Sequence, residues 1–244
     1  MKGPRYEERR YRKLTRLNGL TYFSVLEKES DLYIGALEDL SSEAMKSLKR
    51  HRGFIENYIR QHEEFLRSYV PVPFDPLAPP IVRDMIEAAH RAGVGPMAAV
   101  AGAIAEYVGQ DLLRYSSEII VENGGDIFVA TQRPLNIGVF AGTSPWSGKL
   151  IIHVEEGEMP LGICTSSATV GPSVSFGTAD AVCILSHSAT IADAVASAVG
   201  NRVKRAADIE KAIQFGQRLS GVKGILIIKG EHIGVWGAIK LKFT

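Results

Sequence analysis

Short oxygen-bearing side chains recur near residue 190, where their spacing could hold a cation. Thr190, Asp193, Ser197 and Asn201 follow one another at positions i, i+3, i+7 and i+11, which places them on one face of a helix. An exposed helix face usually carries Lys, Glu or Arg, whereas Asp193 is the single charged residue here before Arg202. Asp193 and Ser197 lie one turn apart and could give two oxygens to a hard cation such as Mg²⁺. The pattern predicts either a cation site or a capped helix with a polar side.

Two loops contain residues suited to binding a ligand. The first loop has paired glycines, which permit positive φ angles and let a ligand approach the main chain. The second loop begins a run dense in hydroxyls and poor in charge, and hydroxyl and free N–H groups can hold phosphate or carboxylate oxygens. A plain hairpin turn and a polar loop without a ligand are the alternatives. The candidate ligand residues are Asn123, Gly124, Gly125, Asp126, Thr165, Ser166 and Ser167.

Cysteine and histidine give weaker signals. Cys164 and Cys183 both lie in apolar stretches, so we expect buried thiols, with a reactive or persulfide-carrying Cys164 as the alternative. The six histidines are scattered without the spacing of a zinc site. The sequence contains no P-loop, GxSxG or GxGxxG motif, so kinase, α/β-hydrolase and Rossmann functions lack their marks.

The elements that must position these residues combine helices with short strands. From Pro96 to about Leu113 the chain has no charged residue before Glu106, so we expect a buried helix that another backbone approaches closely. Short strands separated by Gly, Pro and Asn favour an antiparallel meander over repeated βαβ crossovers, and the combination of strands and helices predicts the α+β class. Further helices are expected at residues 41–68, 81–91, 190–200 and 208–215, and strands at residues 119–122, 127–131, 136–140, 150–154, 161–165, 181–185, 225–228, 232–236 and 239–243.

The N-terminal third reads as a ribbon, a helix and a linker. Asn18-Gly19 is a turn signal that divides strand-like residues 11–27, ahead of a second strand at residues 32–36. In the helix over residues 41–68, Gly53 could mark a bend. Residues 70–80 contain five prolines, which exclude regular structure and predict a linker inside one domain spanning residues 1–244.

The sequence also holds one faint internal similarity. Residues 104–108 and 191–195 share the pattern Ile-Ala-acid-x-Val. Five positions do not establish a repeat. They do place one acid, Glu106 or Asp193, on each of two helices that otherwise consist of small apolar residues.

The overall composition is that of an ordinary globular protein. Hydrophobic residues make up 45%, charged residues 23%, and the net charge is +1, which gives no argument for nucleic acid or a membrane surface as partner. Residues 1–16 are basic, but Glu7 and Glu8 favour a solvated arm over a phosphate- or nucleic-acid-binding one. Without an apolar run of about 20 residues or a signal peptide, we expect a cytoplasmic protein with a small-molecule ligand. Strands at residues 235–243 offer a route to a homodimer.

Several motifs resemble the ApbE-like superfamily, whose members include FAD:protein FMN transferases. The similarity covers roughly Gly95 to Gly200, with looser agreement before it. The matching segments are Gly102–Asp111 with the helix motif GGIAKGYAVD, Gly124–Asp126 with GGD, Thr165–Ser167 with TSG, and Ala192–Ser197 with ADALST.

The resemblance implies a single ApbE-like domain with an antiparallel sheet and packed helices. It implies Mg²⁺ held by Asp193, Ser197 and the backbone carbonyl of Ala105. It also implies FAD, or another flavin or nucleotide, in a cleft between the two helices, with Glu106 beside it. The activity would be transferase-like if the protein is an enzyme.

Given its departures from the motifs, the chain resembles a diverged sister family of undetermined activity. Glu106 stands where the motif has lysine, which reverses the charge expected to face a flavin nucleotide, and Tyr107 replaces a glycine. No His-x-x-Asp-Pro segment occurs between Ser167 and Asp193, so we do not expect FMN transfer itself. The alternative is a non-catalytic auxiliary factor in sulfur assimilation toward homocysteine, a role the resemblance also implies.

Overall fold

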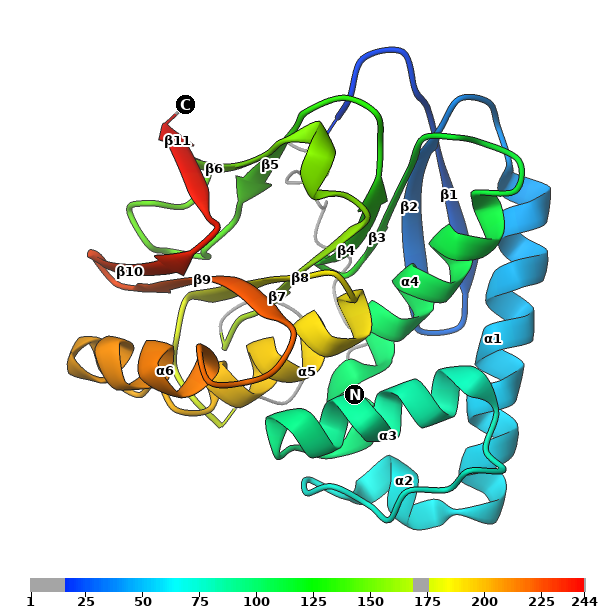
Figure 1. The fold of residues 1–244 in the computed structure, drawn as a ribbon, viewed down its shortest axis with the longest axis horizontal. Helices are drawn as coiled ribbons and strands as arrows, with labels where there is room; N and C mark the ends of the chain where they lie inside the picture. The colour runs from blue at the N-terminus through cyan, green and yellow to red at the C-terminus, as the bar shows by residue number, and fades with distance from the viewer. Residues whose placement is uncertain (1–15, 169–175, 244) are drawn as a thin grey trace, which may run out of the picture.

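An eight-stranded antiparallel sheet forms the frame of the molecule (Figure 1). The structure, a computed structural model, describes residues 16–168 and 176–243. The strands follow the order β1-β2-β3-β4-β7-β8-β9-β10. Their bounds are β1 (Thr21–Glu27), β2 (Ser30–Ala36), β3 (Ile119–Asn123), β4 (Asp126–Ala130), β7 (Leu161–Ser166), β8 (Ala181–Ser186), β9 (Val222–Lys229) and β10 (His232–Gly237).

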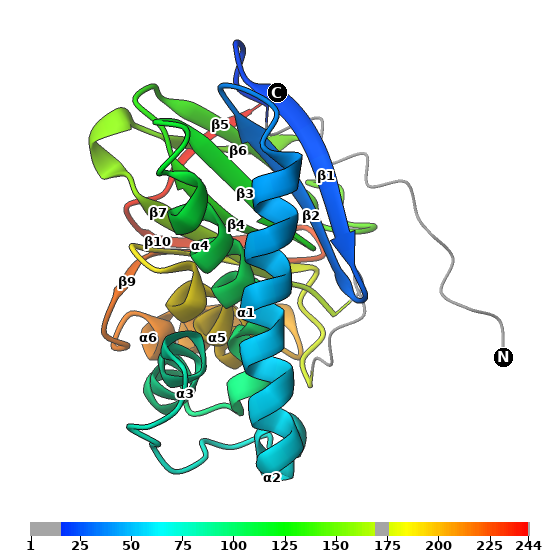
Figure 2. The same ribbon diagram turned by 90° about the vertical axis from the view of Figure 1, so that its right-hand side faces the viewer.

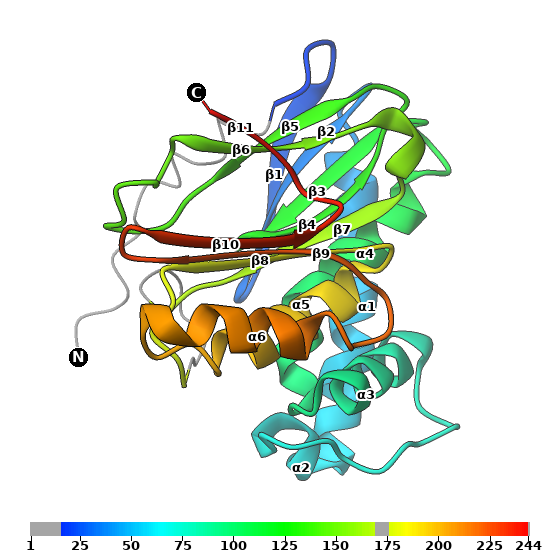
Figure 3. The same cartoon turned by 60° about the vertical axis from the view of Figure 1, so that its left-hand side comes forward.

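A smaller three-stranded sheet covers part of one face of the large sheet, as Figure 3 shows. Its strands follow the order β11-β6-β5. The two sheets share a core of apolar side chains that includes Val129, Ile137 and Ile152. The bounds are β5 (Leu135–Val139), β6 (Leu150–Val154) and β11 (Lys240–Phe243).

The helices cover the opposite face of the large sheet (Figure 2). Their apolar sides form a second core with that sheet, which includes Leu48, Ile104 and Val195. The helices are α1 (Ser41–Gln61), α2 (Glu63–Arg67), α3 (Pro80–Ala92), α4 (Val100–Leu112), α5 (Ala189–Gly200) and α6 (Ile209–Gly216), with 3₁₀ turns η2 (Pro96–Ala99), η3 (Glu156–Glu158) and η4 (Ala206–Asp208).

Strand β8 lies between the two cores, and its sequence reflects this position. Val182 and Ile184 belong to the core under the helices, whereas Cys183 and Leu185 belong to the core between the sheets. Because both faces are buried, the strand is apolar from Ala181 to Leu185 instead of alternating. The α+β class is confirmed.

Helices α4 and α5 pack in direct contact. A Cβ added to Gly102 of α4 would lie 2.2 Å from the carbonyl oxygen of Ala189 in α5. A Cβ added to Gly162 of β7 would lie 2.3 Å from the Cα of the same alanine. The prediction of a buried helix of small residues that another backbone approaches is therefore confirmed.

Two local predictions for the N-terminal half had different outcomes. The turn predicted at Asn18-Gly19 is present, and a further turn at Lys28–Glu29 joins β1 to β2 in the register that buries both Val25 and Leu32 under the helices. Residues 11–15 lie outside the described part. The helix expected over residues 41–68 ends at Gln61, since His62 adopts φ −136° and ψ 76° and its ring stacks on Tyr58.

The pairing of the middle strands also differs from the expected continuous meander. β4 pairs with β7, while β5 and β6 leave the large sheet and pair with each other. The helix expected from Pro96 begins as the 3₁₀ turn η2, so α4 starts at Val100. The C-terminal strands β10 and β11 lie at sheet edges. Pairing between two copies through them stays a prediction.

The described residues include no single helix long and apolar enough to cross a membrane. By length and composition, the bent pair of α3 with η2 and α4 passes that test jointly.

Candidate functional site

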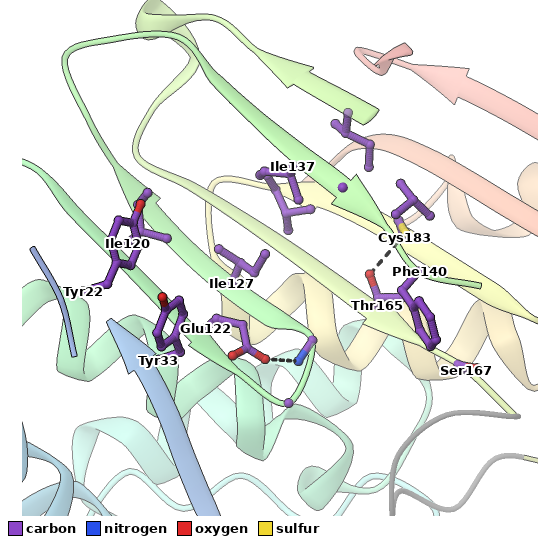
Figure 4. A pocket seen from close by; sticks show the side chains of 16 residues that line it. Tyr22, Tyr33, Ile120, Glu122, Ile127, Ile137, Phe140, Thr165, Ser167 and Cys183 are labelled. Carbon is purple, nitrogen blue, oxygen red and sulfur yellow. Dashed lines mark hydrogen bonds between the residues drawn. The ribbon is translucent and has the colours of Figure 1, made fainter. Parts of the chain in front are cut away.

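A cavity of about 70 Å³ lies between the two sheets (Figure 4). Its walls are mainly isoleucine and valine side chains from both sheets, and polar groups stand along one side. The lining residues are Tyr22, Tyr33, Ile120, Glu122, Gly124, Gly125, Ile127, Ile137, Gly138, Val139, Phe140, Ile152, Ile163, Thr165, Ser167 and Cys183. The sequence predicted a cleft between two helices, but α4 and α5 are in contact and this cavity lies on the other face of the sheet.

The Gly124–Gly125 turn connects the cavity with the helix-covered face. Successive residues of a strand point to opposite faces, so Glu122 lines the cavity while Asn123 Nδ2 donates to the carbonyl oxygen of Ala101 at 3.1 Å. The N–H of Gly125 donates to Glu122 Oε1 at 2.8 Å. The φ angles of +68° and +110° at the two glycines explain why no larger residue stands there.

Two aspartates lie behind this turn. Asp126 Oδ1 accepts from the N–H of Thr165 at 3.2 Å, and Asp193 Oδ2 accepts from the N–H of Gly102 at 2.9 Å. Burial, and then the negative charge of Asp193, raise the pKa of Asp126 well above its ordinary value. Burial raises the pKa of Asp193 to about 7, although the N–H groups of Gly102 and Ala101 favour its charged form. A divalent cation between these carboxylates would relieve their repulsion.

The side chain of Glu106, a residue of α4, contacts the start of α5 and does not line the cavity. Its Oε2 accepts from Ser188 Oγ at 2.8 Å, from the N–H of Thr190 at 2.9 Å and from Thr190 Oγ1 at 2.8 Å. The first turn of a helix has N–H groups without partners inside the helix, and Glu106 supplies an acceptor for one of them. We therefore assign Glu106 to helix capping rather than to ligand contact.

The remaining predicted residues lie on the helix-covered side. Ser197 is half-buried, one turn beyond Asp193 in α5. Ala105 is fully buried and lies one turn beyond the α4 residues that contact Asp193. Ser166 Oγ would lie 3.4 Å from a Cβ on Gly200, which places it against the end of α5. The ten predicted residues other than Glu106 thus divide between the cavity (Gly124, Gly125, Thr165, Ser167) and this second side (Ala105, Asn123, Asp126, Ser166, Asp193, Ser197).

The donor set on the second side suits Mg²⁺. Among the described residues, no group of three or more His, Cys, Asp or Glu side chains could hold a metal ion. Mg²⁺ does not require such a group, because it binds through one or two carboxylates and keeps several waters. Asp193 and Asp126, with the Ser197 hydroxyl one turn away, meet that smaller requirement.

Both cysteines are buried free thiols, as the sequence predicted. Cys164 Sγ donates to the carbonyl oxygen of Ala189 at 3.2 Å, and Cys183 Sγ accepts from Thr165 Oγ1 at 3.1 Å. Burial raises the pKa of Cys164 well above its ordinary value and that of Cys183 to about 11. A reactive thiolate is disfavoured at either position.

Sequence reasoning missed the aromatic end of the cavity. The rings of Tyr22 and Tyr33 stack with centroids 5.3 Å apart, and the guanidinium of Arg16 lies 5.1 Å and 5.7 Å from them. Tyr33 pairs with Glu122 across β2 and β3. The alternation of residues along β1 and β2 indicates which side chains share a face of the sheet. Only the strand pairing shows that the rings of Tyr22 and Tyr33 reach the cavity.

Residues 12–234 match the family model described as AbpE bacteria. The UPF0280 protein of Methanococcus aeolicus is 41% identical over 201 residues, which cover 80% of this chain and 81% of that protein. The UPF0280 protein of Methanospirillum hungatei is 42% identical over 214 residues, which cover 87% and 86% respectively.

Solved structures show the same fold at low sequence identity. A mutant of the flavin transferase ApbE from Vibrio cholerae has a TM-score of 0.57 at 12% identity, covering 90% of this chain and 97% of that one. The flavinyl transferase ApbE of Pseudomonas stutzeri has a TM-score of 0.55 at 14% identity, covering 89% and 94%. The protein belongs to the family described as AbpE bacteria, together with the UPF0280 proteins, and has the fold of the ApbE flavin transferases.

Proposed function

We propose that the protein binds a nucleotide- or flavin-like ligand together with a divalent cation at the Gly124–Gly125 turn. Asp193 and Asp126, with Ser197, would hold the cation, and a ring of the ligand would enter the cavity between the sheets. The structural relatives named as flavin transferases support a flavin as the first ligand to test. The proposal does not extend to FMN transfer, since no His-x-x-Asp-Pro segment precedes Asp193.

One observation carries this proposal: the buried carboxyl of Asp126 and the half-buried carboxyl of Asp193 interact unfavourably behind a glycine turn that lines a cavity. The raised pKa values of Asp126 and Asp193 indicate that negative charge is unfavourable at this turn without a cation, and an anionic phosphate would add to that charge. A cation bound between the carboxylates and the phosphate converts this repulsion into attraction. We therefore expect the cation and a phosphate-bearing ligand to strengthen each other's binding.

The size of the cavity limits how the ligand is held. Sites that enclose a whole drug-sized ligand have volumes of about 300–1,000 Å³, whereas this cavity measures about 70 Å³. Only part of a ring system fits between the sheets, and the rest of the ligand would lie along the turn. The isoleucine walls suit the faces of a ring, and Thr165 and Ser167 can bond to its edge.

Titration of the purified protein with Mn²⁺, followed by electron paramagnetic resonance, tests the cation site. We expect saturable binding that Asp193→Asn abolishes and that Glu87→Gln, on the exposed side of α3, leaves unchanged. FAD at about 100 μM, well above typical cofactor dissociation constants, should tighten Mn²⁺ binding. Equal Mn²⁺ affinity in wild type and Asp193→Asn would remove the proposed site.

A pair of matched substitutions in the small sheet tests the cavity. Val139→Phe should fill the cavity and weaken FAD binding, while leaving Mn²⁺ binding in the absence of FAD intact. Ile151→Phe is the control, because Ile151 lies on the adjacent strand and is not part of the lining. If both variants bind FAD as the wild type does, the ligand does not enter between the sheets.

A further inference from the structure

Helices α4 and α5 exchange capping carboxylates. Ala99, at the N-terminus of α4, has no side-chain acceptor, and Asp193 of α5 accepts from Gly102 in the first turn of α4 instead. In return, Glu106 of α4 accepts from Thr190 in the first turn of α5. Gly102, near the start of α4, bonds to Asp193 further along α5, whereas Thr190, near the start of α5, bonds to Glu106 further along α4. The two helices are therefore antiparallel, and the start of each is bonded to the middle of the other.

From this exchange we infer that Glu106 is a positioning residue for the cation site at Asp193. The inference rests on the proposed function, in which Asp193 is the cation ligand. Thr190 and Asp193 belong to the same helical turn of α5, so a group that fixes Thr190 also fixes the Asp193 carboxylate. Glu106 bonds to both the N–H and the hydroxyl of Thr190 and thereby sets the position of that turn.

The surroundings of Glu106 make this role specific. Glu106 is 9% exposed and Thr190 is 2% exposed, so water has little access to replace the lost bonds. On its other sides the start of α5 is packed without spare space, because Gly102 and Gly162 both abut Ala189. A shift of α5 toward its neighbours is therefore blocked by the main chain. A shift away from them is opposed by the two exchanged caps.

Glu106→Ala and Glu106→Gln separate positioning from a direct charge effect. Alanine removes every acceptor, while glutamine keeps one oxygen in nearly the same place. The first measurement is the hydrogen-exchange protection of the Gly102 amide by NMR without cation, which reports the Asp193 bond. The second is Mn²⁺ affinity. We expect Glu106→Ala to lower Mn²⁺ affinity by about 10–100-fold, as losses of supporting contacts do, and to lower the protection of the Gly102 amide. Glu106→Gln should largely preserve both.

Asp208→Asn provides the matched control. Asp208 is also a capping carboxylate, accepting from the N–H groups of Lys204 at 3.1 Å and Arg205 at 2.9 Å ahead of α6. Its replacement should lower stability without changing Gly102 protection or Mn²⁺ affinity. Should Glu106→Ala not fold, Ser188→Ala and Thr190→Val each remove one donor to Glu106 and should weaken both readouts in the same direction.

The outcomes distinguish this inference from the proposed function. Unchanged Gly102 protection in Glu106→Ala overturns the inference, and so does a loss in glutamine as large as that in alanine. If the wild type binds no Mn²⁺ but Gly102 protection still depends on Glu106, the cation function fails while the positioning of Asp193 by Glu106 stands.

Discussion

At the scale of single residues, Glu106 and Asp193 show how two carboxylates at equivalent positions can have different roles. Both are acids at the same place in an Ile-Ala-acid-x-Val pattern, and both accept from the first turn of the other's helix. Of these two acids, Asp193 is the one that raises the pKa of Asp126, to which Glu122 adds a smaller effect. The Ile-Ala-acid-x-Val pattern therefore indicates the two acids that cap each other's helix. Which of the two belongs to the candidate cation site depends instead on the neighbouring carboxyl of Asp126.

The raised pKa of Asp193 predicts a pH dependence of stability in the absence of cation. The folded-state pKa of about 7 exceeds the ordinary value of 3.8, so the folded protein holds this proton more tightly than the unfolded chain. This contribution to folding is complete below about pH 4 and is lost as the pH rises toward 7. Measured by urea unfolding with EDTA, the stability of wild type relative to Asp193→Asn should fall over that range.

Asp208 is the control for the sign of this effect. Hydrogen bonding from the Arg205 N–H, and next from that of Lys204, lowers the pKa of Asp208 against the raising effect of burial. Its stabilising contribution is therefore lost as the pH falls, so the difference between wild type and Asp208→Asn should change in the opposite direction. Adding Mg²⁺ should reduce the fall, with rising pH, in the stability of wild type relative to Asp193→Asn. A difference between wild type and Asp193→Asn that is independent of pH would contradict this account.

At the scale of elements, composition and periodicity predicted most helices and strands but not their partners. The apolar run of β8 and the small residues of α4 are local signals; β8 was found where the sequence placed it, and α4 begins at Val100 rather than at Pro96. β4 pairs with β7 rather than with β5, which follows it directly in the chain, and the residue types of these two short strands do not decide between them. The cavity exists because β5 and β6 leave the large sheet, so the positions of Tyr22 and Tyr33 in its wall could not be assigned from sequence.

Two glycine-to-alanine changes should have opposite effects on stability, because one glycine lies at the contact between α4 and α5 and the other faces open space on α1. In Gly102→Ala the new Cβ would lie 2.2 Å from the Ala189 carbonyl oxygen, so the helices must separate. We expect a loss of about 1–3 kcal/mol in the free energy of unfolding, typical of overpacking. Gly53 of α1 has open space around its Cβ position, so Gly53→Ala should stabilise by about 0.5–1 kcal/mol. Urea denaturation of both variants checks the pair; two changes of the same sign would refute it.

At the scale of the whole molecule, one sheet is shared by two cores that serve different purposes. The core under the helices fixes α4 and α5, and with them Asp193. The core between the sheets encloses the cavity. The Gly124–Gly125 turn is the place where a ligand could contact both, since it lines the cavity and its flanking residues reach the helix side. Binding there should therefore couple the small sheet to the helices.

This coupling predicts where hydrogen exchange will change on binding. A ring inserted between the sheets contacts Ile137 and Val139 of β5 and Ile152 of β6, so Mg²⁺ with FAD should slow amide exchange across those strands. Helix α3 lines no part of the cavity, and its exchange should change little. Mass spectrometry of the exchanged protein measures both regions in one experiment. Protection confined to α4 and α5 would show that the ligand binds at the aspartates without entering between the sheets, and Val139→Phe should reproduce that restricted pattern.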